Sequence, residues 1–246
     1  MRKKVAGQSP TLLIDQVRLL TKKECTKVTE TVLALRKKWQ KVRRPGPLRD
    51  APYYRLGSSF ESNPKSLPLY TKNYQALNPM MRENFGWLYA RIQEFLTEFF
   101  SEPVIFREDA SLPGFHIIEN DPIFSKFSLP WHTDFDSVLL SWKYPFNRNG
   151  IRTFTLPVCL PTSGATLDIK DIFYNGLFRQ TAAFEQAIEN AEILAKWPHK
   201  LGKILVQDGQ RYHRIGMLRP PFTKGEMRIT LQGYAVHQRN HWAVHW

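Results

Sequence analysis

The segment that decides the fold lies in the C-terminal half of the chain, where residues 202–213 read GKILVQDGQRYH. An apolar run is followed by the turn signal Asp208-Gly209, and His213 stands at the start of a second strand. Similar β-rich segments, separated by Pro, Gly, Asn and Asp, occur at 104–107, 114–119, 131–140, 153–159, 165–169, 213–217 and 228–236. Short strands at this spacing predict an all-β sandwich or jelly roll.

The N-terminal part of the chain has a helical pattern instead. Thr21 and Glu24 have capping-box spacing before a run of apolar residues at helical spacing, which the breaker at 45–47 ends. Asn78 and Pro79 are typical of a second helix start, and an apolar stripe follows to residue 100. We expect residues 1–103 to form a basic, helical layer that packs on the barrel. Residues 104–246 then form the β core, with a helical insertion at about 178–196.

The composition is that of a folded protein and excludes several classes. The chain has 246 residues, of which 42% are hydrophobic and 13% aromatic, and this argues against disorder. Cys25 and Cys159 are too few and too far apart for a disulfide scaffold. No apolar run reaches the roughly 18 residues of a membrane span, and no secretory leader is recognisable. We expect a cytoplasmic protein with free thiols.

The positive charge is concentrated in the first 50 residues. They hold 14 of the 35 Lys and Arg residues but 4 of the 22 Asp and Glu residues, so they carry +10 of the net charge of +13. Such a segment could contact a polyanion, or it could be a solvated helix face. Because it lacks the aromatic interleaving and the motifs of nucleic-acid binders, we expect the solvated face.

Five polar residues on predicted strands form an ordered set. His132 and Asp134 are two residues apart, so a strand would place both side chains on one face. His213 follows on a later strand, and Arg228 and Thr230 again share one face of a strand. Two imidazoles and a carboxylate can form a facial triad for a metal ion, and a guanidinium binds a carboxylate through two parallel hydrogen bonds.

This order of motifs resembles that of the iron(II)- and 2-oxoglutarate-dependent oxygenases, whose fold is a double-stranded β-helix, a form of jelly roll. The resemblance covers about residues 104–236, and residues 160–167 resemble the Gly-containing turn between mid-barrel strands of that family. It implies that His132, Asp134 and His213 are iron ligands. It also implies that Arg228 binds the far carboxylate of 2-oxoglutarate, with Thr230 beside it. The insertion and the lack of a Pro shortly after His213 depart from the family pattern.

The resemblance further implies the activity. Iron(II), 2-oxoglutarate and O2 would together oxidise a substrate, with hydroxylation of an unactivated C–H bond as the expected outcome. Halogenases of this family have a small residue in place of the carboxylate ligand, so Asp134 favours a hydroxylase. Arg228 and the residues after it lack the longer signature of the nucleic-acid-dealkylating branch. A small molecule, an amino acid derivative or a peptide residue is therefore the expected substrate.

Several alternatives stay open. His199 and His237 are competing third ligands that fit the motif order less well. The spacing of His237, His241 and His245 fits a helical metal face or a frayed tail, and we expect the tail. The rival function is a non-catalytic β-sandwich that binds polyanions through residues 1–50. Candidate pocket residues, each of which could instead be part of the core or the wall, are His116, Trp131, Trp142, Tyr144 and Tyr212.

Overall fold

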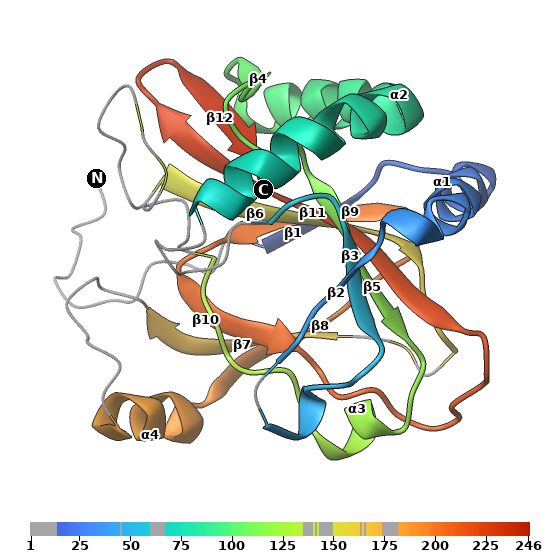
Figure 1. Ribbon diagram of the computed structural model, residues 1–246. Coiled ribbons are helices and arrows are strands. Elements are labelled where there is room, and N and C mark those ends of the chain that lie inside the picture. Colours follow the sequence, from blue (N-terminus) through green and yellow to red (C-terminus); the bar gives the residue numbers. More distant parts are fainter. Residues whose placement is uncertain are drawn as a thin grey trace, which may run out of the picture.

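Two β-sheets face each other in the computed structural model, and helices cover the outer side of the larger sheet (Figure 1). The structure describes residues 14–44, 46–59, 67–134, 140, 142, 150–162, 164, 166–173 and 182–246. Among these, the larger sheet has nine strands, ordered β1-β9-β6-β11-β5-β3-β2, with β12 on β11 and β4 on β12. The smaller sheet has the order β10-β7-β8. This architecture confirms the predicted jelly roll.

The strand bounds place both sheets in the sequence. The larger sheet consists of β1 (Ile14–Arg18), β2 (Gln40–Lys41), β3 (Tyr53–Leu56), β4 (Val104–Phe106), β5 (Gly114–Glu119), β6 (Ile151–Cys159), β9 (Lys203–Asp208), β11 (Met227–Gln238) and β12 (His241–His245). The smaller sheet consists of β7 (Thr166–Phe173), β8 (Ile193–Pro198) and β10 (Arg211–Ile215). The α-helices are α1 (Lys22–Ala34), α2 (Leu67–Phe100), α3 (Ile123–Lys126) and α4 (Ala182–Asn190), and short 3-10 helices span Arg36–Lys38 and Gly46–Leu48.

Strand alternation gives the larger sheet one apolar and one polar face. On β11, Ile229 and Leu231 are fully buried in the main core, which also contains residues of α1 and α2. Arg228 and Thr230 alternate with them and therefore point to the opposite face, toward the smaller sheet. The same alternation on β6 buries Phe154 in the main core and points its neighbours Thr153 and Thr155 the other way. The polar face of the larger sheet is thus available for a site.

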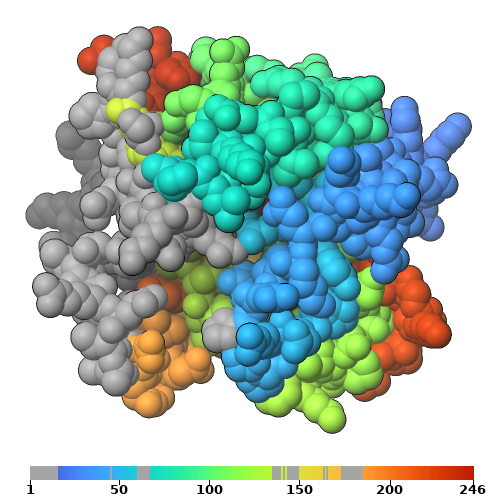
Figure 2. Space-filling model, viewed as in Figure 1, coloured from blue at the N-terminus to red at the C-terminus, as the bar shows by residue number. Residues whose placement is uncertain are grey.

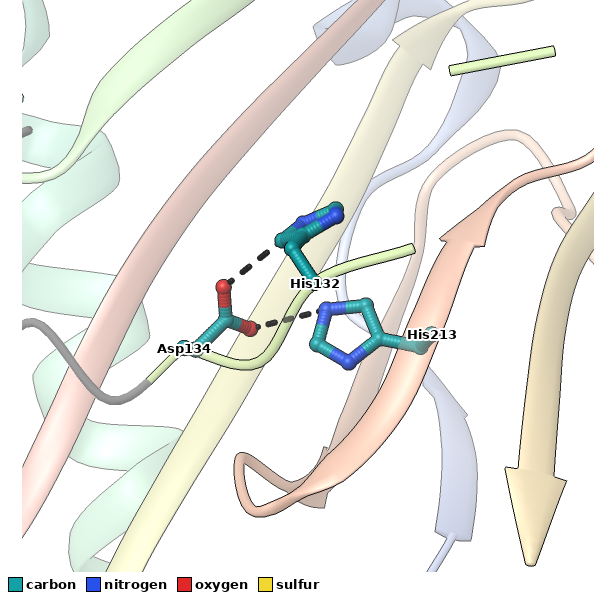
Figure 3. A group of neighbouring side chains, drawn as sticks. All are labelled: His132, Asp134 and His213. Atoms are coloured by element: carbon teal, nitrogen blue, oxygen red, sulfur yellow. Dashed lines mark ion pairs between the residues drawn. The ribbon is translucent and has the colours of Figure 1, made fainter. Parts of the chain in front are cut away.

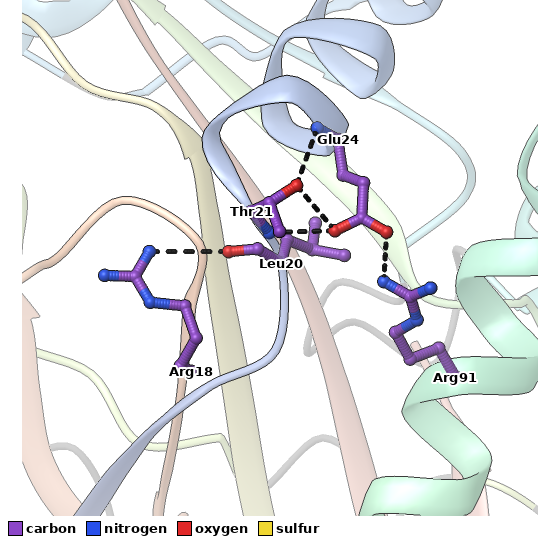
Figure 4. Close-up of polar contacts among 5 residues, drawn as sticks. All are labelled: Arg18, Leu20, Thr21, Glu24 and Arg91. Carbon is purple, nitrogen blue, oxygen red and sulfur yellow. Dashed lines mark hydrogen bonds and ion pairs between the residues drawn. The ribbon is translucent and has the colours of Figure 1, made fainter.

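The capping box predicted at Thr21 is present and links the two main helices (Figure 4). Glu24 Oε2 accepts a hydrogen bond from the Thr21 backbone N–H at 2.8 Å, and the Glu24 backbone N–H donates to Thr21 Oγ1 at 3.3 Å. The other carboxylate oxygen of Glu24 pairs with Arg91 of α2. These hydrogen bonds, first from the Thr21 backbone and then from Arg91, lower the pKa of Glu24 to about 2.

Helix α2 begins earlier than the sequence predicts. The expected start at Asn78 and Pro79 lies inside the helix, which runs from Leu67. Asn78 is not a cap because its side chain has a tertiary role: Nδ2 donates to Ala110 O at 2.9 Å, and Oδ1 accepts from the Leu112 N–H at 3.1 Å. The space-filling view shows α2 (teal) and the N-terminal segment (blue) as neighbouring parts of one surface (Figure 2).

Three other segments differ from expectation. The sequence predicts helices and a long loop over residues 45–77 before residue 104, but β1, β2 and β3 join the larger sheet. The expected helical insertion is a helix only over α4, with residues 174–181 outside the described chain. Residues 193–198 instead form β8, because alternate residues Ala195 and Trp197 pack on the apolar face of β7 while Leu194 is exposed.

The C-terminal segment is neither a frayed tail nor a helix. Its residues 241–245 form β12, which pairs with β11 as a hairpin and with β4 in parallel. Trp246 is fully buried, and its carbonyl accepts a hydrogen bond from Tyr70 Oη at 2.9 Å. Among the described residues, none of the helices combines the length and the apolar composition needed to span a bilayer.

Candidate metal centre

The main chain brings the His132–Asp134 segment and β10 together. His132 and His213 exchange two backbone hydrogen bonds, with N···O distances of 3.0 and 2.8 Å, as an isolated antiparallel bridge. The Asp134 N–H donates to the carbonyl of Gly209, in the turn between β9 and β10, at 3.0 Å. The expected strand over 131–140 is therefore present only as this bridge, and residues 135–139 lie outside the described chain.

The three side chains converge on one point (Figure 3). His213 Nε2 lies 3.1 Å from Asp134 Oδ2, and His132 Nε2 lies 3.9 Å from Asp134 Oδ1. The three potential ligand atoms lie within 4.8 Å of one another. This arrangement is the size of a metal coordination shell.

Backbone carbonyls determine which nitrogen of each histidine carries the proton. His132 Nδ1 lies 3.1 Å from Pro130 O, and His213 Nδ1 lies 2.9 Å from Arg211 O. Because a carbonyl oxygen can only accept, each Nδ1 must donate. A neutral imidazole then has its lone pair on Nε2, the atom that faces the other ligands. The donor set is two neutral nitrogens and one carboxylate, which fits a divalent transition metal with open positions.

The electrostatics of the three residues keep the carboxylate ionised. Burial alone would raise the pKa of Asp134, but the His213 charge, the His213 hydrogen bond and the Thr153 hydroxyl lower it to about 2. Burial disfavours a charged His213, yet the Asp134 carboxylate raises its pKa above the ordinary value. Desolvation at the cavity, followed by the charge of His213, lowers the pKa of His132 to about 4, although its side chain remains 46% exposed. Without a metal, the Asp134 carboxylate therefore favours the protonated form of the buried His213 imidazole.

Gly209 allows the close approach of the turn to Asp134. A Cβ at this position would lie 3.0 Å from Thr153 Oγ1, 3.1 Å from Ile151 Cγ2 and 3.5 Å from Asp134 Cβ. Thr153 Oγ1 itself donates to Asp134 Oδ2 at 2.7 Å. A side chain at residue 209 would therefore disturb the contact that orients the carboxylate.

A cavity of about 350 Å³ opens beside the three residues and extends to Arg228. Arg228 is 3% exposed, and burial lowers its pKa to about 10, so it remains a cation at neutral pH. Its Nη2 contacts His199 Nε2 at 3.5 Å. Within the described part of the chain, Arg228 Nε and Nη1, His199 Nδ1 and Thr230 Oγ1 are buried without a hydrogen-bond partner. Because unpaired buried donors are costly, this end of the cavity fits a carboxylate ligand.

The predicted pocket residues have different locations. His116 lines the cavity, where its Nδ1 lies 2.7 Å from Tyr53 Oη. Trp131 instead contacts the Lys170 and Arg214 cations with its ring, and Tyr212 packs on Ile188. Trp142 belongs to a cluster with Tyr70, Tyr74 and Leu140, and Tyr144 lies outside the described residues.

His199 and His237, the two alternative third ligands, lie outside the group of three potential metal ligands. His199 lies at the Arg228 end of the cavity, and His237 donates to Glu102 Oε2 at 2.7 Å. Thr230 shares a face with Arg228 but is not one of the cavity-lining residues. The cavity also has residues that the sequence analysis did not select, including Arg43, Arg44 and Arg55. The basic charge of the first 50 residues was a signal for Arg43 and Arg44, but no sequence signal indicated Arg55.

Comparison with known proteins adds evidence on the fold. No protein-family model matches the chain, and no curated protein matches it by sequence. The non-heme α-ketoglutarate-dependent epimerase SnoN from nogalamycin biosynthesis matches with a TM-score of 0.52 and 11% identity, over 92% of this chain and 81% of that chain. An N-substituted L-amino acid dioxygenase from Burkholderia ambifaria AMMD gives a TM-score of 0.47 and 14% identity, over 74% of this chain and 70% of that chain.

At such low identity the likeness concerns the fold, and the SnoN match extends over nearly the whole chain. It agrees with the two facing sheets and with the polar, cavity-lined face between them. The chain therefore adopts the double-stranded β-helix fold of the iron(II)- and 2-oxoglutarate-dependent oxygenases.

Proposed function

We propose that the chain is an iron(II)- and 2-oxoglutarate-dependent dioxygenase. One observation carries the proposal: His132, Asp134 and His213 converge within 4.8 Å at one cavity, which also contains the buried, incompletely paired Arg228. A metal triad alone would fit many chemistries. A triad together with a buried guanidinium fits a metal ion and a carboxylate-bearing co-substrate in the same cavity.

Each residue then has a distinct role. His132 and His213 would offer Nε2 to iron(II), because their Nδ1–H groups are held by the carbonyls of Pro130 and Arg211. Asp134 would complete the ligand set. Arg228 would bind the distal carboxylate of 2-oxoglutarate, with the Nδ1–H of His199 and the hydroxyl of Thr230 as further donors nearby. When bound, iron and 2-oxoglutarate would supply the oxidising power from O2.

Hydroxylation of an unactivated C–H bond is the outcome that we propose. Asp134 supports it over halogenation, because the carboxylate fills the position that a halide would need. The substrate would be a small molecule, an amino acid derivative or a peptide residue, since the cavity volume of about 350 Å³ suits a small group. The matched structure SnoN is an epimerase, so product mass must be measured as well as turnover.

The test is an anaerobic titration of the protein with iron(II) and 2-oxoglutarate, followed by visible absorption. We expect a weak charge-transfer band at one iron per chain in the wild-type protein. His132→Ala should abolish the band by removing a ligand, and Arg228→Gln should shift its midpoint to higher 2-oxoglutarate concentration. His241→Ala is the matched control, because His241 lies on β12 away from the cavity.

No band in the wild-type protein, or an equal band in His132→Ala, would refute the proposal. The rival function, polyanion binding by the basic segment 1–50, would then be tested by salt-dependent binding that survives Asp134→Ala.

A further inference from the structure

The cavity wall opposite the smaller sheet is rich in arginine. Besides Arg228, the lining residues include Arg43, Arg44 and Arg55, which come from β3 and the segment after β2. Among the described lining residues, Asp134 is the only carboxylate. Figure 1 shows β2 and β3 at one edge of the larger sheet, where they follow β5.

Local structure holds Arg44 at this wall. The Val42 N–H donates to Tyr53 O at 2.9 Å, and the side chains of Val42, Leu48 and Tyr53 are buried in one apolar cluster. The Arg44 guanidinium lies 5.7 Å from the centre of the Tyr53 ring. Its Nε is buried and has no hydrogen-bond partner in the part of the chain that the structure describes. A fully solvated arginine would have neither this contact with a ring nor a buried Nε.

Arg44 and Arg55 line the same cavity as the candidate metal ligands. Arg44 shares this lining with His116 and His132. Arg55 lies opposite His116 in the pairing of β3 with β5. Both guanidiniums therefore belong to the walls of the cavity that holds the candidate metal ligands.

The proposed co-substrate would leave the charge of Arg44 uncompensated. The two positive charges of iron(II), the carboxylate of Asp134 and the cation of Arg228 are balanced by the two carboxylates of 2-oxoglutarate. The charge of Arg44, whose Nε has no hydrogen-bond partner in the described chain, remains at the cavity. A cavity lined by several guanidiniums favours the binding of an anion, because each guanidinium offers directed hydrogen-bond donors to oxygen atoms.

We propose that the primary substrate is a small molecule bearing an oxyanion, a carboxylate or a phosphate-type group, and that Arg44 binds this group at the end of the cavity formed by β3 and the segment after β2. This inference rests on the proposed function for its account of Arg228, and it names the substrate class of the same cavity. Arg43 and Arg55 add to the positive potential there.

The test uses anion probes and equilibrium binding. The protein is kept anaerobic with iron(II) and saturating 2-oxoglutarate, so that Arg228 is covered and no turnover occurs. Inorganic phosphate, N-benzoylglycine and the uncharged amide of N-benzoylglycine are then titrated by calorimetry. We expect at least one of the two oxyanions to bind. If the carboxylate binds, the amide should bind about tenfold more weakly or worse.

Variants assign the binding to one residue. Arg44→Gln should lower the affinity for the oxyanion about tenfold or more. Arg44→Lys should keep part of the affinity, because lysine has the charge but not the planar donors. Arg36→Gln is the matched control, since Arg36 lies outside the cavity and pairs with Glu119 at 2.7 Å. Thermal melts check that each variant is folded. Tighter binding of phosphate indicates a phosphate-type substrate, and tighter binding of benzoylglycine indicates a carboxylate.

The inference is overturned if neither oxyanion binds with a dissociation constant of about 10 mM or lower. It is equally overturned if Arg44→Gln binds the oxyanion as well as wild type does. Failure of the proposed function is a separate result. The same titration on metal-free Arg228→Gln protein removes iron and the Arg228 charge from the cavity, so oxyanion binding there that is lost when Arg44→Gln is added would uphold the inference even if iron and 2-oxoglutarate did not bind.

Discussion

Thr153→Val should weaken iron binding without removing any metal ligand. Thr153 is 1% exposed, and its hydroxyl donates to Asp134 Oδ2 at 2.7 Å. Valine keeps the volume and the β-branch but leaves one oxygen of a buried carboxylate without this donor. A hydrogen bond to a charged group contributes about 1.5–3 kcal/mol. Loss of a residue that orients a ligand typically lowers metal affinity by about 10–100-fold.

The cause of the weaker binding is orientation rather than protonation. The pKa of Asp134 is about 2, and the Thr153 hydrogen bond is the last of the four interactions that lower it. Asp134 therefore stays ionised at pH 7 in the variant. What changes is the freedom of the carboxylate to rotate away from His213.

The assay is competition for iron(II) against a chelator of known affinity under anaerobic conditions, with urea unfolding of the metal-free protein as a second readout. Thr155→Val is the matched control, because Thr155 lies two residues along the same face of β6 and its hydroxyl makes no such bond in the described chain. Equal iron affinity in wild type, Thr153→Val and Thr155→Val would refute the reasoning.

Three further predictions follow from other contacts. Arg228→Met should abolish the rise in melting temperature caused by 2-oxoglutarate, yet leave the ligand-free protein as stable or more stable, because it removes a buried, incompletely paired charge; a lower stability without ligand would contradict this. Thr21→Ala should lower the free energy of unfolding, measured in urea, by about 1 kcal/mol because the helix cap is lost. Glu24→Gln should lower it by less than about 1 kcal/mol because the ion pair of Glu24 with Arg91 is partly exposed. A larger loss in Glu24→Gln than in Thr21→Ala would contradict this prediction. The raised pKa of His213 stabilises the metal-free protein fully below pH 6.5, and this stabilisation is lost as pH rises through the folded pKa. Iron must displace the proton that His213 carries below its pKa, so the increase in melting temperature caused by iron should grow between pH 6 and pH 8. An increase that is independent of pH would contradict the assignment of His213 as a ligand.

The strand pattern of the sequence was sufficient to predict the jelly roll and the sheet face on which its polar residues lie. Alternation on β11 correctly separates Arg228 and Thr230 from the core residues Ile229 and Leu231. It works because a strand buried on one face against helices requires apolar residues at every second position. The same rule indicated a common face for His132 and Asp134, although the structure reaches it through a single bridge.

Tertiary contacts explain what the sequence could not predict. The side chain of Asn78 bonds the 110–112 segment, so a residue typical of a helix start lies within α2. The C-terminal strand β12 looks like a tail until it pairs with β11 and β4. The sequence around Arg44 indicates a solvated basic run, and the pairing of β2 with β3 and of β3 with β5 places Arg44 at the cavity. Each depends on a partner distant in the sequence, which local patterns do not contain.

The most direct test of the central claim is a crystal of the protein loaded anaerobically with iron(II), with anomalous diffraction measured at the iron absorption edge. The account predicts one strong peak, within bonding distance of His132 Nε2, His213 Nε2 and a carboxylate oxygen of Asp134. No peak at this position, or a peak held by other residues while these three stay empty, would contradict it.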